Sequence, residues 1–314
     1  MARTTSSKVA TPGASIFAVP GRSTVLNLII SIRPGQWTKN LLIFAGLLFG
    51  LRLLDPIAVV DATLAFAIFC GLSGAVYLIN DVLDRETDRQ HPLKARRPIA
   101  SGAVSVPLAI GTAAVVGVVG VTAAFAINLR LGIVSAAYLT LLGLYSAALK
   151  HIVIIDVLTI AVGFVLRAIA GAVAIDVEIS HWLLVCTILG ALFIALAKRR
   201  HELVLLTDGA TSHRPILSEY SPYLLDQMIA VVTASTLISY VFYTISPDTQ
   251  QKFGTPWLGL TIPFPLYGIF RYLYLVHRRE GGGNPAELLL SDRPLLVCVA
   301  LWALTVALLI YRPL

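Results

Sequence analysis

Charged residues are scarce in this sequence. They make up 13% of its 314 residues, about half of the roughly 25% that is usual in soluble globular proteins. So few charges cannot cover a large water-exposed surface, which excludes an ordinary water-soluble enzyme. The 57% of hydrophobic residues excludes a disordered or fibrous chain. It supplies enough apolar length for roughly nine membrane-spanning helices of ~20 residues each.

Acidic residues and cysteine are also in short supply. The 17 Asp and Glu are outnumbered by 24 Lys and Arg, and the net charge is +7. Basic cytoplasmic loops explain such an excess in a membrane protein, so no nucleic-acid partner is expected. Cys70, Cys186 and Cys298 lack the spacing of a metal or redox site. Residues 1–22 lack the apolar core of a signal peptide and are predicted to form a disordered cytoplasmic tail before one catalytic domain at 23–314.

Nine apolar stretches predict nine transmembrane helices in an all-α fold. The first stretch is interrupted by Arg33, Pro34 and Lys39, so its first half should lie at the interface or the helix should break near Pro34. The predicted spans are 25–51, 57–79, 104–125, 129–148, 155–175, 181–197, 225–246, 257–277 and 294–311.

Basic residues are distributed unevenly around these spans. With the N-terminus inside, 18 of the 24 Lys and Arg fall on the inner side and 4 on the outer side. This distribution predicts a multi-pass protein of the plasma membrane with a cytoplasmic N-terminus. The substantial inner loops, 80–103, 198–224 and 278–293, should therefore carry the chemistry on the cytoplasmic face.

An acidic cluster directly follows the second span. If the helix continues, Asp81, Asp84 and Asp88 lie within an arc of ~60°, with Asn80 at its edge. Three carboxylates on one stripe repel each other unless a cation lies between them, and Mg²⁺ typically takes one or two carboxylates together with phosphate oxygens. The pattern indicates a site for a Mg²⁺–diphosphate, and a solvated charged helix end is the alternative.

A basic segment at 91–98 follows the acids and contributes Lys94, Arg96 and Arg97. Carboxylates that hold a metal beside cations that hold phosphate are what a diphosphate site requires. A mutually neutralising surface is the other interpretation.

The run NDxxDxxxD at 80–88, followed by HPLKARRPIASG, resembles the first Asp-rich motif of the UbiA-type intramembrane prenyltransferase superfamily. The resemblance implies nine transmembrane helices around a central cavity that opens to the cytoplasmic side, with Mg²⁺ as cofactor. Ordinary members have a second Asp-rich motif after the sixth span. Here that loop begins Lys198-Arg199-Arg200, which favours a cationic site for an additional phosphate. A positive-inside anchor is the alternative.

Three further segments, RPGQWTKN at 33–40, KHIVIIDVLTIAVGFVLRAIAGA at 150–172 and AKRRHEL at 197–203, resemble the branch of the superfamily that acts on polyprenyl phosphates. This resemblance implies transfer of 5-phosphoribosyl from phosphoribosyl pyrophosphate to decaprenyl or another polyprenyl phosphate, for cell-wall arabinan precursors. An ordinary prenyltransferase acting on a prenyl diphosphate and an aromatic acceptor is the closest alternative, and a lipid transporter is the alternative of another class. The sequence leaves a homo-oligomer open.

Two ionisable residues lie in the fifth predicted span. Asp156 and Arg167 project within ~20° of each other but ~16 Å apart along the axis, too far for a salt bridge. Either they line one polar cavity, with Asp156 nearer the chemistry, or each forms a structural ion pair to another helix. Tyr145 and Lys150 flank the preceding turn and could reach phosphate, and Lys39 could meet the lipid phosphate or snorkel to the surface.

The candidate catalytic residues are Asp81, Asp84, Asp88 and Asp156, and the first three are the candidate metal ligands. The candidate substrate-binding residues are Asn80, Lys39, Lys94, Arg96, Arg97, Tyr145, Lys150, Arg167, Lys198, Arg199 and Arg200.

Overall fold

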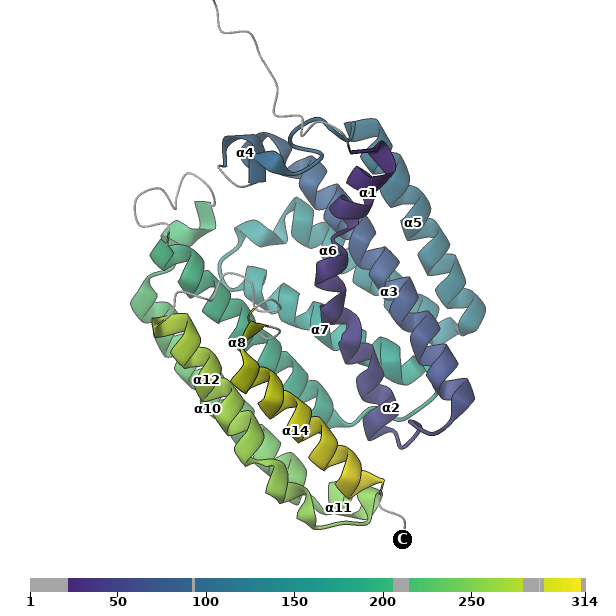
Figure 1. The fold of residues 1–314 in the computed structure, drawn as a ribbon, viewed down its shortest axis with the longest axis vertical. Helices are drawn as coiled ribbons and strands as arrows, with labels where there is room; N and C mark the ends of the chain where they lie inside the picture. The colour runs from purple at the N-terminus through teal and green to yellow at the C-terminus, as the bar shows by residue number, and fades with distance from the viewer. Residues whose placement is uncertain (1–21, 92–93, 206–214, 279–287, 289–290, 312–314) are drawn as a thin grey trace, which may run out of the picture.

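The computed structural model describes residues 22–91, 94–205, 215–278, 288 and 291–311. These residues form α-helices and 3₁₀-helices without a strand (Figure 1). The predicted tail at 1–22 lies, apart from its last residue, outside this part of the chain. Seven helices of the described chain are long and apolar enough to cross a membrane. They are α3 (Pro56–Leu83), α5 (Val106–Ile127), α6 (Leu129–Ala147), α7 (Ile155–Ala174), α8 (His181–Leu205), α10 (Pro222–Ile245) and α14 (Arg293–Ile310).

The first predicted span is a broken rod. It consists of α1 (Thr24–Ile32), the 3₁₀-helix η1 (Pro34–Phe44) and α2 (Ala45–Phe49), which lie along α3 (Figure 1). The break lies at Arg33, which has left-handed backbone angles (φ 56°, ψ 65°) directly before Pro34. Proline disfavours helical angles in the residue before it, so the predicted break near Pro34 is confirmed.

The eighth predicted span is shorter than expected. A 3₁₀-helix, η5 (Trp257–Thr261), precedes α12 (Pro263–Arg278), which has 16 residues. The structure therefore shows an all-helical protein with seven candidate spans, and the two further spans of the nine-helix prediction are a broken rod and this short helix.

Helix α8 corrects the prediction at its C-terminal end. The predicted span stops at residue 197, but the helix continues to Leu205. The basic residues Lys198, Arg199 and Arg200 therefore lie on the last turns of a helix and not in the loop where the sequence analysis placed them.

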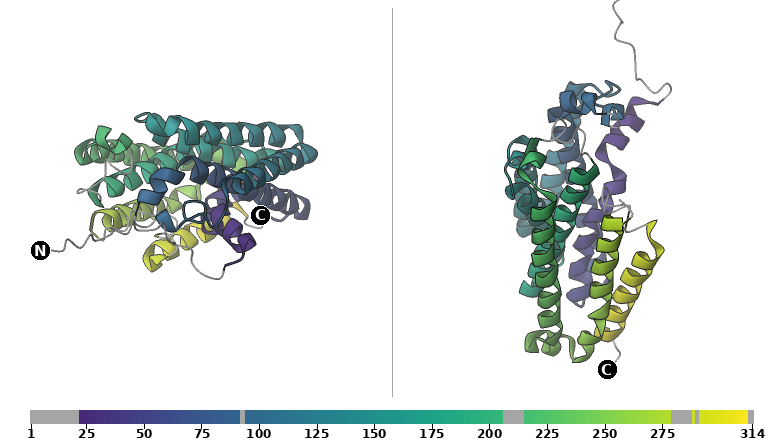
Figure 2. Two further views of the ribbon diagram at one scale, coloured as in Figure 1. Left: turned by 90° about the horizontal axis from the view of Figure 1, so that it is seen from above. Right: turned by 90° about the vertical axis from the view of Figure 1, so that its left-hand side faces the viewer.

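Successive helices pack against one another around the molecule, and α7 contacts η1, α3, α6 and α8 (Figures 1 and 2). At the end that holds α11 (Pro247–Phe253), α14 meets the first rod. The Tyr311 hydroxyl there donates to the carbonyls of Leu47 and Leu48, at 2.9 and 3.2 Å, and accepts from the Leu53 amide at 3.1 Å. The last helix of the described chain is thereby tied to the first segment.

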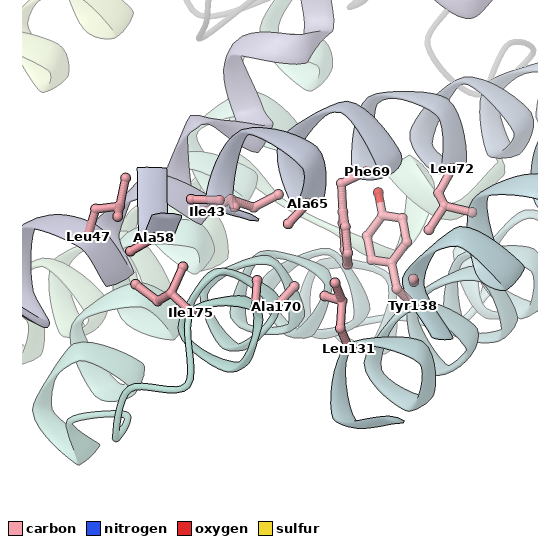
Figure 3. Close-up of a cluster of buried hydrophobic side chains, with 13 residues drawn as sticks. Ile43, Leu47, Ala58, Ala65, Phe69, Leu72, Leu131, Tyr138, Ala170 and Ile175 are labelled. Atoms are coloured by element: carbon pink, nitrogen blue, oxygen red, sulfur yellow. The ribbon is translucent and has the colours of Figure 1, made fainter. Parts of the chain in front are cut away.

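Two apolar cores meet at α7. One joins η1, α2, α3, α6 and α7, and in it the rings of Phe69 and Tyr138 lie with their centroids 5.0 Å apart (Figure 3). The other joins α7, α8, α10 and α12 and includes Val157, Leu196 and Leu225. Helix α7 therefore packs against the helices of both cores.

Small residues let α7 approach the first rod closely. A Cβ atom on Gly171 would lie 1.9 Å from the carbonyl oxygen of Ile43, and one on Gly46 would lie 3.1 Å from the backbone of Gly171 and Ala172. Close backbone contact at glycine is typical of helix pairs in membranes. This close contact fixes the position of the first rod along the axis of α7.

Gly171→Ala is expected to destabilise the protein by about 1–3 kcal/mol, because the added methyl group overlaps a backbone atom that cannot rotate away. The melting temperature in detergent measures the effect. Gly190→Ala in α8 is the matched control, because a Cβ there meets nothing within 4 Å, and alanine favours a helix over glycine. Equal melting temperatures for Gly171→Ala and the wild type would contradict the close crossing.

Candidate functional site

The acidic motif spans a helix junction. Asp81 lies in the last turn of α3, Asp84 lies between α3 and α4 (Arg85–Gln90), and Asp88 lies in α4. A single stripe of carboxylates requires a helix that continues through the motif, but α3 ends at Leu83, and Asp84 has φ −88° and ψ 4°. The three carboxylates consequently do not form one stripe.

Two of the carboxylates converge on the basic segment. Asp81 and Asp88 are both buried, with exposures of 2% each. One nitrogen of the Arg97 guanidinium lies 3.1 Å from Asp81 and 2.6 Å from Asp88. Arg33, at the break in the first rod, also forms an ion pair with Asp81. Two parts of the chain that are distant in the sequence, the break in the first rod and residues 81–97, therefore meet at one charged cluster.

Asp84 faces a different element. Its carboxylate accepts hydrogen bonds from the Lys150 ammonium at 2.5 Å and from the Asn80 amide at 2.9 Å. Lys150 lies on η3 (Leu149–His151), in the short connection between α6 and α7. This contact brings the predicted residues Asn80, Asp84 and Lys150 together.

The chemistry of these acids suits Mg²⁺, but their arrangement is not that of a closed metal cage. Within the described residues, no three acidic, histidine or cysteine side chains are gathered as a metal site. The carboxylates of the motif face the cations of Arg33, Arg97 and Lys150 instead. Mg²⁺ is usually bound by one or two carboxylates together with substrate phosphates. The residues therefore fit a magnesium ion that arrives with a diphosphate.

A second charged cluster joins α7 to α8. Asp156 is completely buried, and its carboxylate accepts hydrogen bonds from Arg199 Nε and from the Tyr220 hydroxyl, each at 2.8 Å. The Arg199 guanidinium also lies 2.8 Å from Glu202 and 3.4 Å from the Tyr145 hydroxyl. Burial and the nearby carboxylate of Asp156 raise the pKa of Tyr220 to about 12. Tyr220 therefore stays protonated, and can donate, at neutral pH.

The basic run on α8 is largely paired with acids. Arg200 forms an ion pair with Asp226 on α10, and the Lys198 ammonium lies 3.8 Å from Glu202. The Arg199–Asp156 pair holds α8 to α7 and the Arg200–Asp226 pair holds it to α10, whereas Lys198 and Glu202 both lie on α8. The structure thus gives the predicted phosphate-binding run a role in packing helices.

Arg167 has partners of its own deeper in the bundle. Its guanidinium donates to Asn40 at 2.7 Å, to the Tyr138 hydroxyl at 2.6 Å and to the Gly163 carbonyl at 3.0 Å. All three partners are neutral. Asp156 and Arg167 therefore bind separate partners. Asp156 forms the ion pair to another helix that the alternative expected, whereas Arg167 forms hydrogen bonds to neutral groups in place of an ion pair.

Lys39 lies beside Asn40 on η1 and is half-buried. The charges that act on its ammonium are those of Arg167 and Arg33, and no carboxylate of the described residues forms an ion pair with it. Three cations, Arg33, Lys39 and Arg167, thus lie close enough to act on one another beside the acidic cluster. Among the described residues, only Arg33 of the three is paired with an acid, Asp81.

The remaining predicted residues lie on a 3₁₀-helix that packs against α4. Lys94 is half-buried and Arg96 is exposed, both in η2 (Lys94–Arg96). Arg33 and Tyr220 are site residues that were not predicted from the sequence. The polar break before Pro34 is a signal that could have identified Arg33. Tyr220 lies in an unremarkable stretch before α10, where composition and spacing offer no signal.

Comparisons with known proteins agree with this architecture. The model of the UbiA prenyltransferase family matches residues 40–291. A decaprenyl-phosphate phosphoribosyltransferase of Mycolicibacterium smegmatis is 33% identical, over 94% of this chain and 95% of its own. One of Corynebacterium glutamicum is 32% identical over 93% and 89%. The solved structure of an Archaeoglobus fulgidus UbiA homologue bound to GPP and Mg²⁺ has a TM-score of 0.71, with 19% identity, over 92% of this chain and 99% of its own.

Proposed function

Because the chain belongs to the UbiA prenyltransferase family, we propose that it transfers 5-phosphoribosyl from phosphoribosyl pyrophosphate to decaprenyl phosphate and releases pyrophosphate. The observation that carries the proposal is the similarity to enzymes named for this reaction, over more than nine-tenths of this chain. The clustered acids and cations of the candidate site supply the chemistry that such a charged donor requires.

We assign the donor diphosphate to the cluster around Asp81, Asp84 and Asp88. Mg²⁺ bound with the diphosphate would neutralise charge on the leaving pyrophosphate, and the solved relative bound to GPP and Mg²⁺ supports this choice of metal. Arg97 and Lys150, which contact these acids, lie where they can turn to phosphate oxygens once a metal satisfies the carboxylates.

The reaction itself needs little proton chemistry. A non-bridging oxygen of the lipid phosphate attacks the anomeric carbon of the ribose, and the bond from that carbon to the pyrophosphate oxygen breaks. A phosphate monoester is anionic near pH 7, so the nucleophile needs no strong general base. The residues of the chain then act by positioning the two substrates and by stabilising the charge of the leaving group.

We place the acceptor phosphate at Lys39 and Arg167. These two cations lie on η1 and α7, and neither forms an ion pair with a carboxylate of the described chain. A cation within a membrane-spanning bundle is costly unless an anion or a polar partner compensates it. Arg167 has only neutral polar partners, so the lipid phosphate supplies the anion that neither cation has within the described chain, and the polyprenyl chain remains in the bilayer.

Lys39→Gln is expected to raise the KM for the polyprenyl phosphate by about tenfold, which corresponds to ~1.4 kcal/mol, with little change in the KM for phosphoribosyl pyrophosphate. Steady-state kinetics with each substrate varied in turn measures the difference. Lys252→Gln, in α11 at the other end of the bundle, is the control and should leave both values unchanged. An increase in the donor KM alone would place Lys39 on the donor.

This assignment places the α4 end of the bundle, where the acidic motif lies, on the cytoplasmic side of the plasma membrane. The excess of Lys and Arg predicted for that side supports the orientation. It also gives the site access to a soluble sugar phosphate, while the lipid acceptor reaches it from the membrane.

The decisive experiment uses purified protein, labelled phosphoribosyl pyrophosphate, Mg²⁺ and decaprenyl phosphate. A labelled lipid and free pyrophosphate in equal amounts are expected, without any membrane gradient. Transfer of a prenyl chain from a prenyl diphosphate to an aromatic acceptor, with no phosphoribosyl product, would overturn the proposal.

A further inference from the structure

The turn that leads into α7 has an unusual backbone. Ile154 has φ 68° and ψ −42°, and the amide of Ile155 donates to the carbonyl of Val153 at 2.8 Å. Together these features define a γ-turn of the positive-φ form, which is rare and strained. A β-branched residue is especially disfavoured there. Such a backbone persists only where the surroundings hold it in place.

Tyr220 provides that hold. Its hydroxyl accepts a hydrogen bond from the Ile154 amide at 2.8 Å and donates one to the Asp156 carboxylate at 2.8 Å. The side chain is buried and packs in the core that includes Val157 and Leu225. One hydroxyl group therefore bonds both the strained residue and the first turn of α7.

The same connection carries a site residue. Lys150 lies on η3, four residues before Ile154, and η3 packs against α6, α7 and η4 (Pro215–Glu219), the 3₁₀-helix that precedes Tyr220. From there the Lys150 ammonium reaches Asp84, 2.5 Å away. The path of the backbone from α6 to α7 thus determines where this cation meets the acidic motif.

We infer that Tyr220 is a positioning residue for the donor site. By holding the Ile154 turn, it sets the position of Lys150 against Asp84, so a residue directly before α10 controls a contact between the α6–α7 connection and the acidic motif. The inference rests on the proposed function only for the identity of the donor.

The test begins with Tyr220→Phe, which keeps the ring and removes both hydrogen bonds. The KM for phosphoribosyl pyrophosphate is expected to rise roughly tenfold, less than the 10²-fold loss that a misplacement of about 1 Å can cause. The KM for the polyprenyl phosphate should not change. Tyr223→Phe is the matched control, because Tyr223 is a nearby tyrosine that is exposed at the start of α10, and it should leave both values unchanged.

A second substitution separates positioning from general packing. Glycine adopts a positive φ without strain, so Ile154→Gly should keep the turn in place without the hydroxyl. In the Tyr220→Phe background, Ile154→Gly is expected to lower the KM for phosphoribosyl pyrophosphate most of the way back to the wild-type value. A loss of packing would not be rescued by removing a further side chain.

Failure to rescue, or an equal rise in both KM values in Tyr220→Phe, would overturn the inference. A wild-type enzyme that uses a prenyl diphosphate would overturn the proposed function instead. The same variants, measured with that donor, would then still test whether Tyr220 positions Lys150.

Discussion

Asp84→Asn is expected to lower kcat/KM for phosphoribosyl transfer by about 10²–10³, the loss typical of removing one group that stabilises developing charge. Asp84 is the acid of the motif that faces Lys150, and it is less deeply buried than Asp81 and Asp88. The substitution keeps the size of the side chain and removes the negative charge that would bind the Mg²⁺ accompanying the diphosphate. Turnover measured over a range of Mg²⁺ concentrations tests it.

Glu86→Gln is the matched control for that experiment. Glu86 lies in the same motif, but its side chain is 74% exposed and pairs with Arg89, so activity should stay near the wild-type value. Near wild-type turnover of Asp84→Asn at every Mg²⁺ concentration would contradict the assignment of Asp84 to the metal and diphosphate.

Arg199→Ala is expected to destabilise the protein by about 3–5 kcal/mol, because it leaves a buried carboxylate without its counter-charge. The side chain of Arg199 is 2% exposed and that of Asp156 is 0% exposed, so water cannot replace the guanidinium. The melting temperature of the purified protein should fall sharply, with or without substrate.

Arg130→Ala is the comparison for Arg199→Ala. Arg130 pairs with Asp176 at 3.1 Å, but these side chains are 75% and 89% exposed, and exposed pairs contribute ~0–1 kcal/mol. If Arg199→Ala melted like the wild type and had only a raised donor KM, Arg199 would bind the donor's 5-phosphate, as the basic run first suggested.

The local features of the fold could be predicted from the sequence. The break at Pro34 followed from the geometry of proline, and most helix ends lay within a few residues of the predicted spans. The proximity of Arg97 to Asp81 and Asp88 followed from their closeness along the chain. These features depend on residues near one another in sequence, which periodicity and spacing describe.

The pairings between distant helices could not be predicted. The sequence does not show which side chains face the basic run on α8, so the run was predicted to bind phosphate. In the structure, Asp156 and Asp226 face it and pair with Arg199 and Arg200. The C-terminal end of α8 was also not predicted. The apolar run stops at residue 197, but charged residues can end a hydrophobic run without ending a helix, and α8 continues to Leu205. Tyr220 is the extreme case, since its role comes from one backbone amide in another loop.

The neutral partners of Arg167 have a consequence for how the protein is made. An arginine at the centre of a single helix costs ~2.5–3.5 kcal/mol on scales derived from insertion by the translocon. Asn40 and Tyr138, to which Arg167 donates, both precede it in the chain and are therefore synthesised first. Helix α7 enters the bilayer after its polar partners, and a circular permutation that moved α7 ahead of them would make the charge enter alone.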